Sequence, residues 1–263
     1  MKPLSLLILC ALVLTACNPQ AQLITLRGSN VKPTDEGLVL DTDTLSLRYQ
    51  FYSERGVIHL TVFNKLDRPL YVNWKKSAFI IGSDKLDYWY DVATVNLTGS
   101  AYSYRYSRYA TVGLGGTITK DDPVGFIPPR TQLEKYEFVV VPGEPLRLAG
   151  QPKLREETRT NLYVGAESDV VKKKKITVSQ YEYPTPEQSP LQFRNFLTFS
   201  TRQDFQTEFY VDTKFWASGV QILPKTQLLG QPIVAQDGRM YYDSHNPYRR
   251  NDSFYVFLPD DPQ

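Results

Sequence analysis

The sequence predicts an antiparallel all-β fold, and three observations support this expectation. Apolar and polar residues alternate with a period of two through several short segments, which is the pattern of strands with one buried face. These segments recur at intervals of about 8–12 residues, with turn residues between them, as they do in β-sandwiches. Aromatic residues make up 13% of the chain and include 18 tyrosines, and such side chains favour pleated, half-buried surfaces. We therefore expect an Ig-like β-sandwich.

The clearest strands lie in the first half of the chain. Residues 45–52 and 57–63 predict a hairpin with one apolar face, because Leu45, Leu47 and Tyr49 alternate with polar residues. Asn, Asp and Pro then mark a turn over residues 64–69. Further strands are expected at 70–74, 77–81 and 134–141, with another hairpin within 84–95.

The second half of the chain repeats the same pattern. Strands are expected at 172–179, 193–200, 208–213, 216–222 and 253–258. A further hairpin is expected within 231–242, because Asp237-Gly238 is a strong signal for a two-residue hairpin turn.

These elements suggest a division of the chain. We assign 1–17 to a signal peptide, 18–36 to a tether, 37–150 to β-sandwich strands, 151–190 to a linker or basic hairpin, and 191–258 to C-terminal strands. Within 37–150, residues 98–122 form a Tyr/Gly/Ser-rich insertion that is either a long loop or a floppy hairpin. The C-terminal strands either complete the sandwich or form a second small β module, and the sequence leaves both alternatives open.

The N-terminus carries an export signal. Lys2 precedes an apolar run, Leu4–Leu14, which is shorter than the roughly 20 residues that span a bilayer. The run ends in Leu14-Thr15-Ala16-Cys17, which resembles the lipobox of bacterial lipoproteins. This resemblance implies a diacylglyceryl group on the Cys17 thiol, cleavage before Cys17, and N-acylation with a chain such as palmitate. Two or more acyl chains anchor a protein stably, so the membrane is the first expected partner.

The residues after Cys17 bear on its destination. Residues 18–22 contain no acid, and this resembles the sorting signal for the outer membrane, with the periplasmic face favoured over the cell surface. We expect a lipid-anchored protein of the cell envelope.

Composition excludes several chemistries. The only other cysteine, Cys10, lies in the signal peptide, so the mature chain has no thiol for catalysis, disulfides, zinc or iron–sulfur clusters. A net charge of +2 argues against a nucleic-acid partner, which would require a basic face. We expect neither a cofactor nor a metal.

The sequence also offers little for catalysis. His59 falls within a strand and His245 within a turn, and the chain has no Gly-x-Ser-x-Gly motif. Adjacent acids occur at Glu156-Glu157 and at two other positions, where nothing predicts a raised pKa. We expect the protein not to be an enzyme, since a hydrolase would need a pocket that joins His245 to a distant serine and acid.

Two segments are candidate binding surfaces. Tyr102, Tyr104 and Tyr106 alternate and would form an aromatic stripe in an extended chain, which suits a sugar ring or a partner surface. Lys172, Lys173, Lys174 and Lys175 could meet acidic lipid or glycan phosphate. The alternatives are that the tyrosines pack on their own sheet or belong to a loop, and that the lysines protect an edge strand. Trp74 and Trp89 are expected in the core.

One longer segment resembles a known group. Residues 63–80, with the pattern Asn-x-x-x-x-Pro-x-Tyr-x-x-Trp from Asn64 to Trp74, look like a segment of uncharacterised Bacteroidota-type lipoproteins, as does Ile127-Pro128-Pro129. That group has no established activity, so the resemblance supports only the envelope location. The resulting hypothesis is a non-enzymatic, membrane-anchored envelope lipoprotein that acts as an interaction or assembly module. A glycan-binding accessory lipoprotein is the alternative, and a hydrolase is the third.

Overall fold

The predicted antiparallel all-β sandwich is confirmed by the structure, a computed structural model. The structure describes residues 20–90, 94–103, 110–119, 122–164, 169–228, 232–234, 240–242, 246 and 248–259. The helices among these residues are short 3-10 turns, η1 (Trp74–Lys76), η2 (Pro186–Gln188) and η3 (Lys225–Gln227). Within the described part of the chain, no helix is both long and apolar enough to cross a membrane.

The strands follow one another along the chain in two compact units. They are β1 (Gln20–Gly28), β2 (Lys32–Thr34), β3 (Gly37–Asp41), β4 (Leu45–Gln50), β5 (Val57–Asn64), β6 (Leu70–Asn73), β7 (Ala78–Ile81), β8 (Asp84–Asp87), β9 (Thr94–Ser103), β10 (Ala110–Thr119), β11 (Val124–Ile127), β12 (Gln132–Val139), β13 (Lys153–Val164), β14 (Asp169–Glu182), β15 (Gln192–Ser200), β16 (Glu208–Pro224), β17 (Pro232–Val234), β18 (Met240–Tyr242) and β19 (Ser253–Phe257). Unit 1 comprises Met1–Val62, Glu134–Phe193 and Thr213–Gln263, and unit 2 comprises Phe63–Leu133 and Arg194–Asp212.

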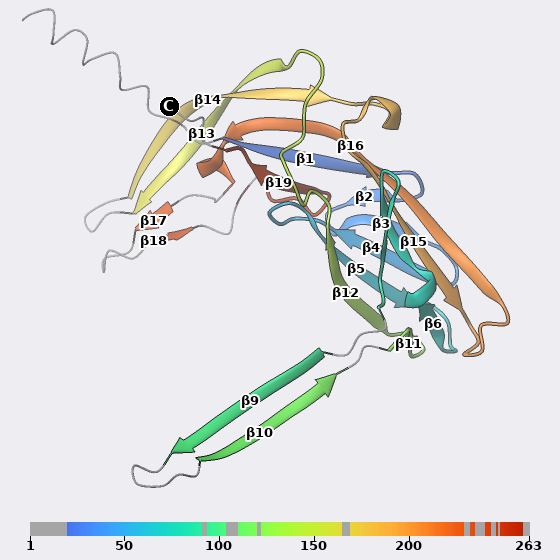
Figure 1. The fold of residues 1–263 in the computed structure, drawn as a ribbon. Helices are drawn as coiled ribbons and strands as arrows, with labels where there is room; N and C mark the ends of the chain where they lie inside the picture. The colour runs from blue at the N-terminus through green and yellow to red at the C-terminus, as the bar shows by residue number, and fades with distance from the viewer. Residues whose placement is uncertain are drawn as a thin grey trace, which may run out of the picture. The chain divides into compact units, whose positions relative to one another are not determined.

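Unit 1 is built from two sheets with aromatic side chains between them. One sheet has the order β12-β5-β4-β3-β2, and the other contains β14-β16-β1-β19 (Figure 1). The predicted alternation in β4 is confirmed, because Leu45, Leu47 and Tyr49 are buried. The Phe215 ring of β16 lies 5.0 Å from the ring of Tyr49 and 5.5 Å from that of Phe51, with edge-to-face geometry in both pairs. These rings form the centre of the sandwich core.

Strand β1 differs from the tether that we expected over residues 18–36. Gln20–Gly28 pair with β16 on one side, and Ala21–Thr25 pair with β19 on the other. Four consecutive residues of β1 are buried, namely Ala21, Gln22, Leu23 and Ile24. A strand that is buried on both faces has no period-two alternation, so the pattern that revealed β4 and β5 is absent here.

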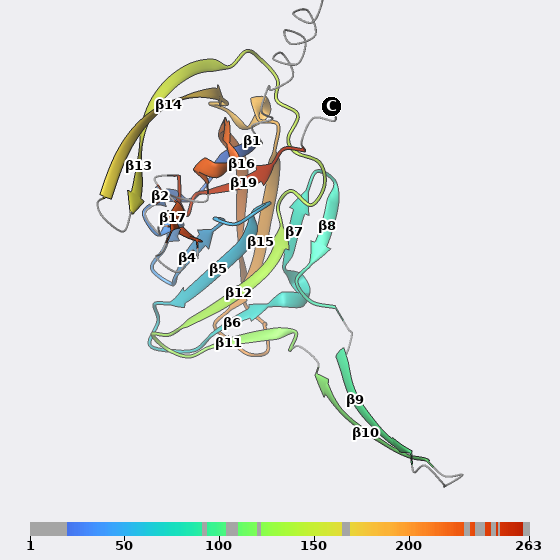
Figure 2. The ribbon, with the colours of Figure 1, turned by 90° about the vertical axis from the view of Figure 1, so that its left-hand side faces the viewer.

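Strands β13 and β14 form a long curved hairpin in unit 1, in the segment expected to be a linker or basic hairpin (Figure 2). Ile176 and Val178 of β14 are buried in a second apolar cluster with Ala21, Leu23 and Tyr248, among others. This cluster lies on the face of β1 that carries Ala21 and Leu23, and it accounts for the burial of that face.

Unit 2 contains antiparallel strands of the ten-stranded sheet. Strand β6 pairs with β11 and with β15, and β7 pairs with β15 and β8. Leu70, Val72 and Phe199 are fully buried on its inner face, where the Tyr88 hydroxyl donates a hydrogen bond of 2.8 Å to the buried Asn195 side chain. Trp74 is buried as expected, whereas Trp89 is only half-buried.

Three segments bear on the sequence predictions in detail. Residues 98–122, for which the sequence allows either a long loop or a hairpin, are mostly a hairpin in which β9 pairs with β10. Its β-branched threonines and valines favour extended backbone, although glycine and serine are frequent in its composition. The two strands expected at 208–213 and 216–222 are one strand, β16. The hairpin predicted within 231–242 is confirmed, because β17 pairs with β18.

Candidate functional site

The sequence-predicted site residues lie in separate places. Cys17, Tyr104 and Tyr106 lie outside the described residues, as does His245. Tyr102 belongs to β9, where its backbone is opposite Thr111. The structure therefore gives no geometry for the predicted tyrosine stripe, and its role in binding stays a prediction.

The four lysines lie in the middle of the β13–β14 hairpin. In the pairing register, Lys172, Lys173, Lys174 and Lys175 are opposite Asn161, Thr160, Arg159 and Thr158. The Lys175 side chain is exposed, and its Nζ lies 3.5 Å from a carboxylate oxygen of Glu156. An exposed cation in this position is compatible with both predicted roles, binding of acidic lipid or glycan phosphate and protection of an edge strand.

The described residues offer little for acid–base catalysis. His59 stacks on Tyr136 with ring centroids 3.9 Å apart, and its Nε2 lies 3.3 Å from a carboxylate oxygen of Glu134. Glu156 and Glu157 are neighbours in β13, so their side chains point to opposite faces, and Glu157 accepts a 2.6 Å hydrogen bond from the Tyr248 hydroxyl. Within the described ranges, no group of three or more His, Cys, Asp or Glu is placed to hold a metal ion.

An aromatic face on the outer side of the unit 2 sheet is the clearest candidate site. In the register of β6 and β11, Tyr71 is opposite Phe126, and their ring centroids are 5.6 Å apart. The Phe205 ring, from the turn between β15 and β16, lies 6.4 Å from Tyr71. On the neighbouring strands, Phe196 stacks on Tyr210 with a centroid distance of 5.2 Å and an interplanar angle of 24°. We call these five residues the aromatic face.

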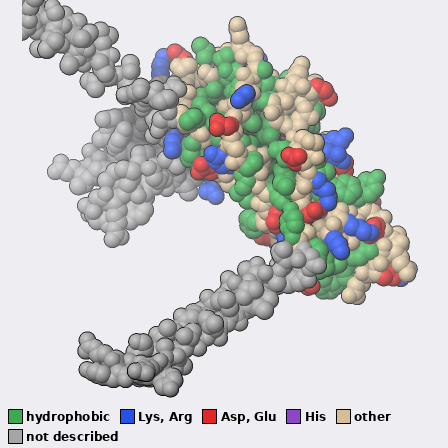
Figure 3. Space-filling view, viewed as in Figure 1, with side chains coloured by type: hydrophobic (Ala, Val, Ile, Leu, Met, Phe, Trp, Pro, Cys, Tyr) green, Lys and Arg blue, Asp and Glu red, His purple; other side chains and the backbone are tan. Residues whose placement is uncertain are grey.

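The aromatic face is on the solvent side because its members alternate with core residues. Tyr71 lies between the buried Leu70 and Val72, and Phe196 lies between the buried Asn195 and Leu197. Phe126 remains 55% exposed and Tyr210 remains 69% exposed. In Figure 3, hydrophobic side chains stand among charged ones in the region where Figure 1 labels β6 and β11.

Ion pairs surround the aromatic face. The guanidinium of Arg194 donates to both carboxylate oxygens of Asp212, and Lys76 donates to Glu208 at 2.6 Å. Arg202 makes the same forked contact with Asp204, and these hydrogen bonds hold the pKa of Asp204 at about 2, below its ordinary value of 3.8. Each of these cations has an acidic partner, so the rim is polar but carries no strong net charge.

Sequence reasoning did not identify the aromatic face. Its residues come from four strands and one turn that are distant in sequence, and no local motif joins them. The available signal was an aromatic residue at an outward position of a predicted strand, as at Tyr71 within 70–74 and Phe196 within 193–200. The tyrosine-rich segment was more conspicuous because its aromatic residues are close together in the sequence.

No protein-family model, curated protein or solved structure matches this chain.

Proposed function

We propose that this protein is a lipid-anchored interaction module of the bacterial cell envelope, and that the aromatic face binds a partner protein. The observation that carries the proposal is the exposure of Phe126 and Tyr210 on one outward sheet face together with Tyr71, Phe196 and Phe205. Exposed apolar patches with polar rims are typical of protein interaction sites. Lipidation at Cys17 would hold this module at a membrane.

The composition of the face favours a protein over a glycan. Phenylalanine supplies three of the five rings, and it has no polar group to bond a sugar hydroxyl. Aromatic residues and arginine are enriched in the centres of protein interfaces, whereas unpaired charges are depleted there. The paired arginines Arg194 and Arg202 at the rim fit this pattern.

The lack of a catalytic arrangement among the described residues is compatible with a binding role. The proposed partner is a folded envelope protein with an apolar patch and a neutral rim that matches the one described here. A glycan, or a second copy of this chain, is the outcome that would contradict this choice.

Site-specific photo-crosslinking tests the proposal. A photoreactive residue at position 196, in the lipidated protein in native membranes, should crosslink to one defined protein. The double variant Phe126→Ser/Tyr210→Ser, with the photoreactive residue at position 196, should lose most of that product, because central aromatic residues commonly supply much of an interface's binding energy.

The matched control is Leu154→Ser, which removes another exposed apolar side chain, 72% exposed, on β13 in unit 1. This variant should leave the crosslink unchanged. Equal crosslinking by the control and the double variant would contradict the proposal. A product that joins only two copies of this chain, or this chain and a glycan, would also contradict it.

A further inference from the structure

A polar pocket in unit 1 has no part in the proposed function. It has a volume of about 490 Å³. Its walls come from β1, from β2 and the turn after it, and from the turn before β19. Its lining residues are Arg27, Pro33, Thr34, Asp35, Arg249, Arg250, Asn251 and Asp252. Pro33 is the only apolar residue among them, so a ligand of this pocket must be hydrophilic.

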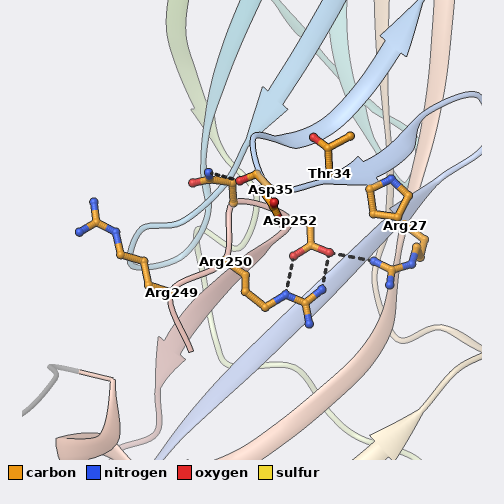
Figure 4. A pocket seen from close by; sticks show the side chains of 8 residues that line it. Arg27, Thr34, Asp35, Arg249, Arg250 and Asp252 are labelled. Carbon is orange, nitrogen blue, oxygen red and sulfur yellow. Dashed lines mark hydrogen bonds and ion pairs between the residues drawn. The ribbon is translucent and has the colours of Figure 1, made fainter. Parts of the chain in front are cut away.

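Two arginines in the pocket share one buried carboxylate. The Asp252 side chain is only 4% exposed, and Arg27 Nη1 donates to its Oδ2 at 2.9 Å. Arg250 donates to both oxygens of Asp252, from Nε at 3.0 Å and from Nη2 at 2.6 Å. Figure 4 shows both guanidinium groups directed at this carboxylate, while Arg249 points away from it.

The shared carboxylate leaves hydrogen-bond donors available. A guanidinium has five N–H bonds. Arg250 directs Nε and Nη2 at Asp252, and Arg27 directs Nη1 at Asp252 and at the Leu26 carbonyl. Among the residues that the structure describes, no other acceptor bonds either guanidinium, and both side chains are partly exposed, at 37% for Arg27 and 52% for Arg250.

The backbone around the pocket is held by hydrogen bonds to several strands. The Asp252 carbonyl accepts from the Leu26 amide at 2.8 Å, and the Asn251 carbonyl accepts from the Phe51 amide at 3.0 Å. The Asn251 side-chain amide donates to the Asp35 carbonyl at 2.9 Å. The arginines are thus fixed before any ligand arrives, which lowers the entropic cost of binding.

Charge in the pocket favours a monoanion. Three arginines and two aspartates line the pocket, which gives the lining a formal charge of +1, although the Arg249 guanidinium points away from Asp252. The free edges of Arg27 and Arg250 present planar N–H groups, and such groups match a planar carboxylate. Asp35, at the exposed rim, would repel a second negative charge on the ligand, so a phosphate dianion fits less well.

The other polar groups favour hydroxyls on the same ligand. The Asn251 amide oxygen and the Asp35 carboxylate are acceptors, which suit hydroxyl donors. The mostly polar walls disfavour a peptide with large apolar side chains. We propose that this pocket binds a hydrophilic monocarboxylate of the sugar-acid class, with its carboxylate against Arg27 and Arg250 and its hydroxyls toward Asn251 and Asp35.

A ligand-observed NMR titration of the full chain in neutral detergent tests this proposal. The probes are glucuronate, glucose, acetate and a glycine tripeptide with a free C-terminus. Glucuronate should bind saturably, whereas glucose lacks the carboxylate and acetate lacks the hydroxyls, so each should bind at least about tenfold more weakly.

The informative variant is Arg250→Lys, which keeps the positive charge beside Asp252 but removes the planar fork. It should weaken glucuronate binding about tenfold while the protein stays folded. The control is Arg194→Lys, which removes an equivalent two-pronged contact, the one between Arg194 and Asp212 in unit 2. This variant should leave glucuronate binding unchanged.

Several outcomes would overturn the proposal. These are no saturable binding of glucuronate, equal binding of acetate or of the tripeptide, and equal affinity of the wild type and Arg250→Lys. The double variant Phe126→Ser/Tyr210→Ser should bind glucuronate normally, so failure of this proposal and failure of the proposed function are separable.

Discussion

Asn64 shows how one side chain can hold a turn. It is fully buried, and its amide donates to the carbonyls of Arg68, Ile127 and Pro128 at 2.9–3.1 Å. Its side-chain oxygen accepts from the Leu66 amide at 3.0 Å. The turn after β5 and the end of β11 therefore depend on the same side chain.

Substituting Asn64→Asp should destabilise the protein by about 3 kcal/mol, because a buried carboxylate would face three carbonyl oxygens without a proton to donate. Urea denaturation measures this change. The control is Asn73→Asp, at the start of η1, where the side chain only accepts a hydrogen bond from the Lys76 amide and aspartate can do the same. A loss below about 1 kcal/mol at Asn64 would contradict the argument.

Two glycines with positive φ differ both in backbone angle and in the space around them. Gly37 has φ of +125°, and a Cβ there would lie 2.3 Å from the Tyr49 carbonyl oxygen. Gly82 has φ of +59°, and a Cβ there would meet nothing within 4 Å. Substitution to alanine should cost about 1 kcal/mol at Gly82 but about 4 kcal/mol at Gly37. Equal losses in thermal unfolding would contradict the added cost of the less accessible backbone angle and the close contact at Gly37.

At the scale of elements, β1 is a strand that the sequence pattern did not predict. Strands with one solvent-exposed face, such as β4 and β5, could be predicted because apolar and polar residues alternate along them. Strand β1 is buried on both faces, so its sequence lacks this alternation. The aromatic face was missed for a related reason, since it depends on the lateral order of strands, which local pattern does not contain.

The position of β1 predicts the effect of truncation. A chain without residues 20–36 should lose cooperative unfolding, because β16 and β19 would both lose their partner and the buried Ile24 and Leu26 would be absent. A chain that lacks only residues 1–19 should keep it. Circular dichroism during thermal unfolding distinguishes the two, and a cooperative transition in the shorter chain would restore the tether interpretation.

The turn between β15 and β16 has its own pH dependence. Hydrogen bonds from Arg202 and from the Gln206 amide keep the pKa of Asp204 at about 2. Because this pKa is lower than the ordinary value of 3.8, the contribution of the contact is present above that value and is lost as pH falls through about 2.

Substituting Arg202→Gln should raise the pKa of Asp204 toward 3.8, and NMR titration of the carboxyl carbons measures it. The internal control is Asp67, whose pKa is lowered by hydrogen bonds from a different arginine, Arg130. Asp67 should titrate unchanged in the variant. A low pKa of Asp204 without Arg202 would assign the effect to the backbone of the turn instead.

For the whole molecule, the start of β1 changes the expected distance from the membrane. A tether over 18–36 would let the folded part move tens of ångströms from a lipid on Cys17. Since β1 begins at Gln20, only Asn18 and Pro19 intervene, and three fully extended steps span about 10 Å. If Cys17 is lipidated as proposed, the N-terminal end of β1 is held against the membrane surface.

Two lysines at the ends of the β1–β16 pairing provide matched positions to test this distance. Lys225 follows Pro224, which is opposite Gln20, whereas Lys214 precedes Phe215, which is opposite Gly28. These positions are separated by the length of β1, about 30 Å for nine residues. Because the mature chain has no other thiol than that of Cys17, a fluorophore on Lys225→Cys or Lys214→Cys reports a single site.

A quencher on the lipid headgroups should quench the label at position 225 strongly in the lipidated protein reconstituted in vesicles. It should quench the label at position 214 less if β1 extends away from the surface, because contact quenching falls off well within the length of the strand. A protein that begins at residue 18 and carries the same labels should show neither effect, since it has neither the lipid nor the signal peptide. Weak quenching at position 225 in protein purified from membranes would mean that the anchor lies farther from β1 than two intervening residues allow, and would contradict lipidation at Cys17.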